Sequence, residues 1–249
     1  MRAGSLATYT GWEMPVLEVG HGVWLFSGGG QTELQGLIHF LEANYSFHRF
    51  ERKTPARIKP GPKPNRLPTQ RNLGYTGTAL AEQIREVLPV SCRFGRCDLL
   101  LIIDDLDCHD PVHRRAMFDK TVQSVPEANG IQRIIGFAAP EIEAWLIADW
   151  NHTFATDYEL RTFHKALQYR LGENGVAFVT PENFSQYDDD RDACVMKLSE
   201  MLATEVFECS GVRYSKADHS SRMLQHAQAY VIAQNCPEFR VIHNGLNHE

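Results

Sequence analysis

Residues 98–110 constrain the fold more than any other part of the chain, because an apolar stretch there runs directly into a group of acids. Residues 99–103 are apolar without alternation, which is typical of a strand covered on both faces of a parallel sheet. The acids that follow are Asp104, Asp105, Asp107 and Asp110. Because the carboxyl ends of parallel strands open into the crevice where α/β proteins bind ligands, this segment predicts a site as well as a sheet.

Asp105 and Asp107 are spaced so that their carboxylates can act together. Alternate side chains of an extended backbone point to the same side, so both carboxylates would face one way. They repel each other unless a proton or a cation lies between them, and hard oxygen ligands favour Mg²⁺ or Mn²⁺. We therefore predict a metal site that includes Asp105, Asp107 and Asp110; the alternative is a solvated loop or a helix N-cap.

The surrounding strands and helices predict an α/β fold. Residues 23–26 form an apolar strand, glycines follow at 28–30, and Thr32 is placed to cap a helix over residues 33–44. Further on, the patterns predict a helix over residues 78–88 closed by Pro89, a helix over residues 111–125 and a strand over residues 131–137. Strand, glycine turn and helix open an α/β unit, so we expect a mostly parallel sheet flanked by helices.

A second acidic group follows the strand predicted over residues 131–137. Glu141 and Glu143 come at the beginning of the next helix, at another carboxyl end of the same sheet. They are candidate catalytic residues; the alternative is that the helix dipole favours acids in a first turn. Trp145, on the same helical face as Glu141, is expected in the core rather than in a surface that stacks on bases.

The chain changes character after Asp149. Helical patterns cover residues 156–171, 191–206 and 218–234. Pro237 is expected to stop the last of them. We therefore predict an α/β domain over residues 1–150 and a mainly helical C-terminal subdomain over residues 151–249 that packs on it.

Basic side chains are concentrated in one segment. The net charge of −6 argues against a protein that binds polyanions over its whole surface, but residues 46–77 are rich in proline and basic residues. Prolines prevent a regular helix, so we predict a long loop. Its candidates for contact with nucleic-acid phosphates are Arg52, Lys53, Arg57, Lys59, Lys63 and Arg66. A solvated loop or a protein docking site is the alternative.

The composition is that of an ordinary globular protein: 249 residues, 43% hydrophobic and 22% charged. No apolar stretch approaches the length of a membrane span, and the N-terminus lacks the pattern of a signal peptide, so we expect no membrane association. The six cysteines show no pairing pattern, which best fits a reducing cytoplasm.

Four motifs, taken in order, bear on the family. Asp-x-Asp-x-x-Asp stands at residues 105–110, Pro-Glu-Ile-Glu-Ala-Trp-Leu-Ile-Ala-Asp at 140–149, Tyr-Ser-Lys at 214–216 and Asn-Cys-Pro-Glu-Phe at 235–239. With these motifs the chain, from about residue 22 to its end, resembles a family of bacterial TOPRIM-like proteins. That family is related to the TOPRIM nucleases of overcoming-lysogenization-defect type and is often paired with ATPases in defence against phage.

The resemblance implies a TOPRIM-like, Rossmann-like fold, a Mg²⁺ (or Mn²⁺) cofactor and cleavage of phosphodiester bonds. In TOPRIM domains a glutamate after the first strand and an Asp-x-Asp pair after a later one hold Mg²⁺, and the pair carries over to Asp105 and Asp107. The residue after the first strand is Ser27, so the nearest acid, Glu33, would have to reach back to serve as a ligand or base. One of the two glutamates at 141 and 143 is the other candidate, and Lys216 would neutralise charge on the phosphate.

Three functions remain open. The first is a metal-dependent nuclease that acts on DNA or RNA, as an effector in an anti-phage or toxin-like system with a partner ATPase. The second is a non-catalytic scaffold, which Ser27 favours, and the third is a small-molecule phosphohydrolase or phosphotransferase. Metal binding separates the first and third from the second, and dependence on the basic loop separates the first from the third. Assembly into a homo-oligomer also remains open.

Overall fold

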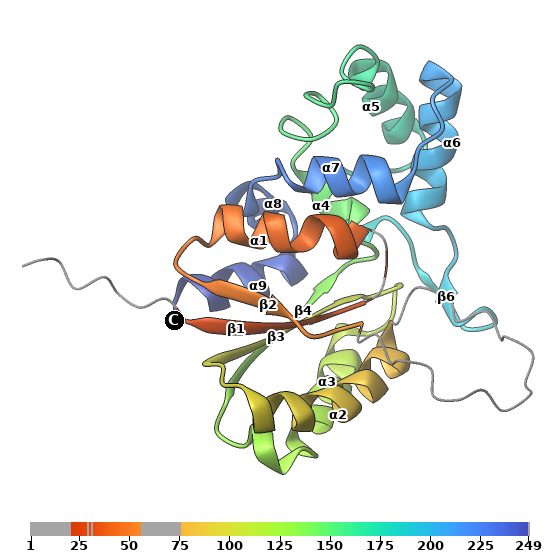
Figure 1. Ribbon diagram of the computed structural model, residues 1–249. Coiled ribbons are helices and arrows are strands. Elements are labelled where there is room, and N and C mark those ends of the chain that lie inside the picture. The colour runs from red at the N-terminus through yellow and green to blue at the C-terminus, as the bar shows by residue number, and fades with distance from the viewer. Residues whose placement is uncertain (1–20, 29, 31, 56–75, 249) are drawn as a thin grey trace, which may run out of the picture.

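The computed structural model describes residues 21–28, 30, 32–55 and 76–248, without the side chains of Glu33 and Leu34. At its centre is a parallel sheet of four strands in the order β2-β1-β3-β4 (Figure 1). The strands are β1 (Gly22–Ser27), β2 (Arg49–Arg52), β3 (Leu99–Asp105) and β4 (Gln132–Ala138). The predicted α/β class and parallel sheet are confirmed.

Helices cover both faces of the sheet (Figure 1). The helices are η1 (Glu33–Leu37), α1 (Ile38–Asn44), α2 (Gly77–Phe94), α3 (Pro111–Gln123), η2 (Pro126–Ala128), α4 (Glu143–Ala148), α5 (His164–Glu173), η3 (Pro181–Asn183), α6 (Leu198–Ser210), η4 (Lys216–Ser220), α7 (Ser221–Leu224), α8 (Ala229–Asn235) and α9 (Pro237–Asn247). α2 and α3 lie on one face, whereas α1, α8 and α9 lie on the other. A short antiparallel hairpin, β5 (Tyr187–Asp188) and β6 (Ala193–Cys194), precedes α6.

The central strands bury both rows of their side chains. In β1, Val23 and Leu25 belong to the core shared with α1 and α9, whereas Trp24 and Phe26 belong to the core under α2 and α3. Alternate side chains of a strand point to opposite faces, so a sheet covered on both faces needs an uninterrupted apolar run. Residues 99–103 of β3 are all buried for the same reason.

The last helix, α9, lies close against β4. A Cβ atom at Gly136 in β4 would come 2.1 Å from the side chain of Ile242 in α9, and one at Gly245 in α9 would come 2.5 Å from Ile134 in β4. Each glycine therefore makes room for an isoleucine of the other element. Since the C-terminal helices share one hydrophobic core with α1 and the sheet, the division of the chain near residue 150 stays a prediction.

The prediction of a loop over residues 46–77 is wrong at its beginning, because residues 49–52 form the strand β2. Four residues beside a proline-rich stretch are too few to show a strand pattern, but they pair in parallel with β1 and bury Phe50. Sheet pairing therefore decides this strand rather than its own sequence. Most of the predicted loop, residues 56–75, lies outside the described residues.

α2 is longer than predicted because it continues through Pro89 to Phe94. A proline inside a helix lacks the N–H that would bond the carbonyl four residues earlier, here that of Arg85. Arg85 lies on the exposed side of the helix, where water can bond this carbonyl. The helix therefore ends only before Gly95, whose N–H bonds the carbonyl of Ser91.

The ends of several other helices also differ from the prediction. Thr32 caps no helix, because its hydroxyl donates to the carbonyl oxygen of Lys216 at 3.0 Å. The predicted last helix is divided into η4, α7 and α8, and α5 and α6 begin later than expected. Pro237 begins α9 instead of ending the helical region, since the first turn of a helix does not need the missing N–H.

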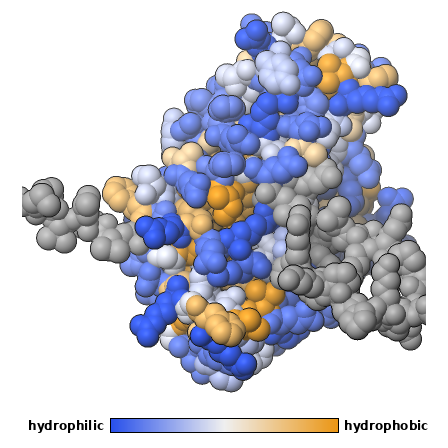
Figure 2. Space-filling view, in the orientation of Figure 1, coloured by the Kyte–Doolittle hydropathy of each residue, from blue (hydrophilic) through white to orange (hydrophobic). Residues whose placement is uncertain are grey.

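The surface shows no single dominant apolar region on the face drawn in Figure 2, which is mainly hydrophilic with small, separate hydrophobic patches. In the described part of the chain, no helix combines the length and the apolar character that crossing a membrane requires. Inside the molecule Trp145 is fully buried against Phe40 and Phe239, which confirms its predicted place in the core.

Candidate active site

The two predicted acidic groups meet at the carboxyl ends of β3 and β4. These strands are neighbours, and Asp105 pairs with Ala138 at the end of the ladder. The Oδ1 atom of Asp105 accepts a hydrogen bond from the N–H of Ile142 at 3.2 Å, which ties the end of β3 to the segment that holds Glu141 and Glu143. Parallel pairing therefore brings together acids that lie far apart in the sequence.

Lys216 reaches into this group from η4. Its Nζ lies 3.4 Å from Oε1 of Glu141 and 3.1 Å from Oε2 of Glu143. The latter contact is an ion pair rather than a well-directed hydrogen bond, because Oε2 of Glu143 has no hydrogen-bonding partner. We call Asp105, Asp107, Glu141, Glu143 and Lys216 the acid–lysine cluster.

Two serines hold the buried glutamates of the acid–lysine cluster. Glu141 accepts hydrogen bonds from the backbone N–H of Ser199 at 2.8 Å and from its hydroxyl at 3.1 Å. Glu143, which is completely buried, accepts a hydrogen bond from the hydroxyl of Ser220 at 2.9 Å. Both carboxylates are therefore fixed by the C-terminal helices, since Ser199 belongs to α6 and Ser220 to η4.

One ammonium group balances several carboxylates here. Burial by itself would lower the pKa of Lys216, but the carboxylates of Glu143, Asp105 and Glu141 together raise it above its ordinary value. Lys216 is therefore charged at neutral pH. Burial, which disfavours the charged form, raises the pKa of Glu143; the carboxylate of Glu141 raises it further, and the ammonium of Lys216 opposes both effects.

Asp107 lies in a turn with a strained backbone. Its φ is 47° and that of Cys108 is 64°, both in the left-handed region that residues with a Cβ rarely adopt. The N–H of Asp107 donates to the carbonyl of Pro140 at 2.9 Å. Burial raises the pKa of Asp107, whereas the positive charge of Lys197 lowers it. Backbone strain of this kind often accompanies functional sites.

The donor chemistry of the cluster suits a hard divalent cation, since all of its acidic ligands are carboxylates. In the structure the Lys216 ammonium lies between Glu141 and Glu143, in the place that a divalent metal ion would take. No group of three or more His, Cys, Asp or Glu side chains in the described residues is close enough to hold a metal ion. Binding of Mg²⁺ therefore stays a prediction, and it would require the cluster to rearrange.

Of the other two predicted metal ligands, one has another role and the side chain of the other is not described. Asp110 is the N-cap of α3, where its Oδ1 accepts from the N–H of Val112 at 2.8 Å, and its Oδ2 lies 2.8 Å from His113. These contacts correspond to the helix-cap alternative. Glu33 begins η1, but its side chain lies outside the described part of the structure.

Ser27 stands where the resemblance expects a glutamate, and it belongs to a separate polar group. Its N–H donates to Oγ1 of Thr54 at 2.9 Å, and Arg52 donates to the Ser27 hydroxyl at 3.0 Å. Arg52 also donates to the carbonyl of Gly28 at 2.9 Å. The contacts described at this end of β1 therefore join neutral oxygens to a guanidinium.

The basic candidates for nucleic-acid contact are only partly described. Arg52 makes the contacts at the end of β1 given above. Lys53 lies over the ring of Trp24, with its Nζ 4.3 Å from the ring centroid, and pairs with Glu51. Its positive charge lowers the pKa of Cys97, which precedes β3 at the opposite end of the sheet from the acids. Lys53 therefore points away from the acid–lysine cluster. The others, Arg57, Lys59, Lys63 and Arg66, lie outside the described residues.

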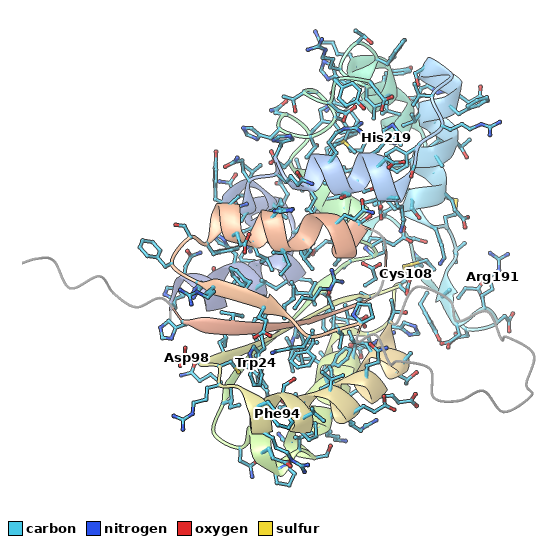
Figure 3. All side chains as sticks on the ribbon, in the orientation of Figure 1. Trp24, Phe94, Asp98, Cys108, Arg191 and His219 are labelled. Atoms are coloured by element: carbon cyan, nitrogen blue, oxygen red, sulfur yellow. A yellow bond between two sulfur atoms is a disulfide. The ribbon has the colours of Figure 1, made fainter. Side chains whose placement is uncertain are left out.

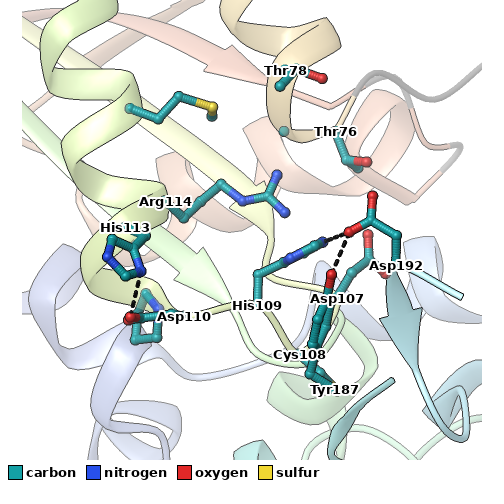
Figure 4. A pocket seen from close by; sticks show the side chains of 13 residues that line it. Thr76, Thr78, Asp107, Cys108, His109, Asp110, His113, Arg114, Tyr187 and Asp192 are labelled. Carbon is teal, nitrogen blue, oxygen red and sulfur yellow. Dashed lines mark hydrogen bonds and ion pairs between the residues drawn. The ribbon is translucent and has the colours of Figure 1, made fainter. Parts of the chain in front are cut away.

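A cavity of about 980 Å³ adjoins Asp107 (Figure 4). Its wall comes from the beginning of α2, the turn after β3, α3 and the β5–β6 hairpin. Arg114 points into it and lies 3.4 Å from the buried carboxylate of Asp104. Asp104 also accepts a hydrogen bond from the N–H of Gly77 at the beginning of α2. Asp104 therefore stabilises the fold and does not belong to the acid–lysine cluster.

Cys108 and Cys194 form a disulfide across 86 residues of sequence. This finding corrects the expectation that the cysteines show no pairing; the remaining cysteines, all within the described residues, are free. Figure 3 shows Cys108 at the opposite end of the sheet from Asp98, and in the sequence Cys108 directly follows Asp107. The bond joins the turn after β3 to the β5–β6 hairpin.

Several residues of the site could not be recognised from the sequence. Ser199 and Ser220 lie in ordinary helical stretches, and no pattern predicts that they hold glutamates more than fifty residues away. Lys197 and Arg114, which influence the pKa of Asp107, look like surface charges in the sequence. The usable signals were the Asp-x-Asp and Glu-x-Glu spacings and the Tyr-Ser-Lys motif that contains Lys216.

The fold and the cluster define an α/β protein with acidic side chains and one lysine gathered at the carboxyl end of its sheet. Comparisons with protein families, with curated proteins and with solved structures found no match to this chain. The TOPRIM resemblance therefore stays a prediction that rests on the motifs.

Proposed function

We propose that the chain hydrolyses phosphodiester bonds at the acid–lysine cluster, as a nuclease of TOPRIM type. The observation that carries the proposal is the convergence of both predicted acidic groups and Lys216 at one edge of the sheet. This is the edge at which parallel α/β sheets bind their ligands. A role in anti-phage defence with a partner ATPase rests on the resemblance alone and is part of the same proposal.

The burial of each acid suggests a division of roles. Asp105 and Asp107 are half-buried and can meet a substrate, whereas Glu141 and Glu143 are buried and hold Lys216. We assign the aspartates to the reacting phosphate and the glutamates to the positioning of the lysine. The Lys216 ammonium would neutralise charge that develops on the phosphate oxygens.

The raised pKa of Asp107 suits a group that takes a proton from an attacking water molecule. A Mg²⁺ or Mn²⁺ ion, if bound by Asp105 and Asp107, would polarise the phosphate and lower the pKa of that water. Arg114 lies in the adjoining cavity, where it can contact a neighbouring phosphate.

The test is hydrolysis of plasmid DNA, single-stranded RNA and bis(p-nitrophenyl) phosphate, with and without Mg²⁺ or Mn²⁺. Asp105→Asn and Asp107→Asn should each lower the rate by about 10²–10⁴-fold, the usual contribution of a proton-transferring or ligand carboxylate. Asp119→Asn is the matched control: Asp119, on α3, forms a surface ion pair with Arg133 of β4, and its replacement should leave the rate unchanged.

Other outcomes would favour the alternatives. Hydrolysis of phosphate monoesters but not of diesters would indicate a small-molecule phosphohydrolase. A protein that neither binds metal nor cleaves any of these substrates would favour the scaffold, which the Lys216 ion pairs and the residue Ser27 already support. Activity retained in both aspartate variants would contradict the proposal directly.

A further inference from the structure

Within the described residues, the β5–β6 hairpin makes few contacts with the rest of the chain. Tyr187, Asp192 and Val195 are exposed to solvent, and the hairpin has only two residues in each strand. A cavity of about 980 Å³ and another of about 470 Å³ both border it. An element with so little buried surface opens easily unless something fastens it.

The noncovalent contacts between the hairpin and the turn after β3 involve mainly His109. Its ring lies 4.7 Å from that of Tyr187, and its Nε2 lies 3.9 Å from Asp192 (Figure 4). The contact with Asp192 is weak, because the two groups are 3.9 Å apart and the Asp192 side chain is largely exposed to solvent. Among the described residues, the disulfide Cys108–Cys194 is therefore the principal attachment.

One end of the same disulfide, Cys108, belongs to the strained turn after β3. Cys108 directly follows Asp107, and both have a positive φ, which the protein must hold against the ordinary preference of the backbone. We propose that the Cys108–Cys194 disulfide is a redox-sensitive tie that holds the β5–β6 hairpin over the cavity and Asp107 in place. Its reduction by a small-molecule thiol frees the hairpin and loosens the turn.

The chemistry is ordinary thiol–disulfide exchange. A thiolate attacks the sulfur of Cys108, which borders both cavities, the S–S bond breaks, and Cys194 leaves as a thiolate that takes a proton from water. A second small thiol then displaces Cys108 from the mixed disulfide. The products are two protein thiols and one small-molecule disulfide, so two electrons pass to the protein.

Hydrogen exchange tests the tie without any assumption about activity. Amides of residues 185–196 should exchange about tenfold faster after reduction with dithiothreitol, and equally fast in the Cys194→Ser variant under oxidising conditions. Cys209→Ser is the matched control, since Cys209 is a free cysteine on α6, and its variant should behave like the wild type. Equal exchange before and after reduction would overturn the proposal, as would two free thiols at Cys108 and Cys194 in protein purified without reductant.

The effect on the site rests on the proposed function. If the acid–lysine cluster is the active site, reduction should lower the rate of phosphodiester hydrolysis at least about threefold, because Asp107 loses its position. An unchanged rate with faster hairpin exchange would contradict the link to Asp107. When neither redox state hydrolyses the substrate, the proposed function fails, and the exchange experiment alone still decides whether the tie exists.

Discussion

At the scale of single residues, Lys216 decides the character of the site. Its ammonium lies among carboxylates that would otherwise repel one another, in the position of a cation. Replacing it by Met leaves Glu143 buried without its positive partner, and removing one member of a buried pair is far more costly than removing both.

We expect Lys216→Met to lower the free energy of unfolding by about 1–3 kcal/mol at pH 7, less than for a fully buried pair because the lysine side chain is 38% exposed. The double variant Lys216→Met/Glu143→Gln should recover at least part of this loss. Urea denaturation measures both, and a Lys216→Met protein as stable as the wild type would contradict the assignment.

The same variant tests the metal site. If the acids can hold a divalent cation, millimolar Mg²⁺ should raise the Tm of Lys216→Met more than that of the wild type, because the ammonium no longer competes. An equal response of both proteins would indicate that the acids bind no metal even when the lysine is absent.

At the scale of elements, α9 is joined to η3 by Glu182. Its carboxylate accepts hydrogen bonds from the N–H groups of Glu238 at 3.0 Å and Phe239 at 3.3 Å, in the first turn of α9. Burial nevertheless raises the pKa of Glu182 to about 7. The folded protein thus holds this proton at a pH where the unfolded chain has released it, so the stabilisation is present at low pH and is lost as the pH rises through 7.

We therefore expect the free energy of unfolding of the wild type to fall between about pH 5 and about pH 8 by on the order of 1–3 kcal/mol more than that of Glu182→Gln. Denaturant titrations at several pH values measure the difference. Glu173→Gln, at the exposed end of α5, is the control and should follow the wild type. A Glu182→Gln profile parallel to that of the wild type would show that this carboxyl is already ionised at low pH.

At the scale of the whole molecule, one core extends from the first strand to the last helix. Phe239 of α9 is fully buried and packs against Phe40 of α1 and Trp145 of α4. An N-terminal α/β part and a C-terminal helical part that share such contacts should unfold together.

Phe239→Ala should lower the free energy of unfolding by about 3–5 kcal/mol, through lost burial and the cavity left behind. Tryptophan fluorescence and far-ultraviolet circular dichroism should shift together in one transition. Phe207→Ala is the control, because Phe207 is 50% exposed on α6 and its loss should change stability by less than about 0.5 kcal/mol. Two separate transitions, with only one shifted by Phe239→Ala, would instead support an independent subdomain after residue 150.

The sequence by itself determined β1, β3 and β4 and the place of the acids at their ends. These features are local: a continuous apolar run of a few residues predicts a buried strand, and the acids that follow it must lie at its carboxyl end. The burial of Trp145 belongs to the same class, since it follows from the helical pattern around it, whereas Asp110, predicted as a metal ligand, is an N-cap in the structure.

Only the tertiary structure decided β2, the disulfide and the partners of the buried glutamates. β2 forms because its backbone pairs in parallel with that of β1. Cys108 bonds Cys194 across 86 residues of sequence because the hairpin folds back to the end of β3. Ser199 and Ser220 hold Glu141 and Glu143 for the same kind of reason. Such contacts depend on how distant elements pack, and packing leaves no periodic trace in the sequence of either partner.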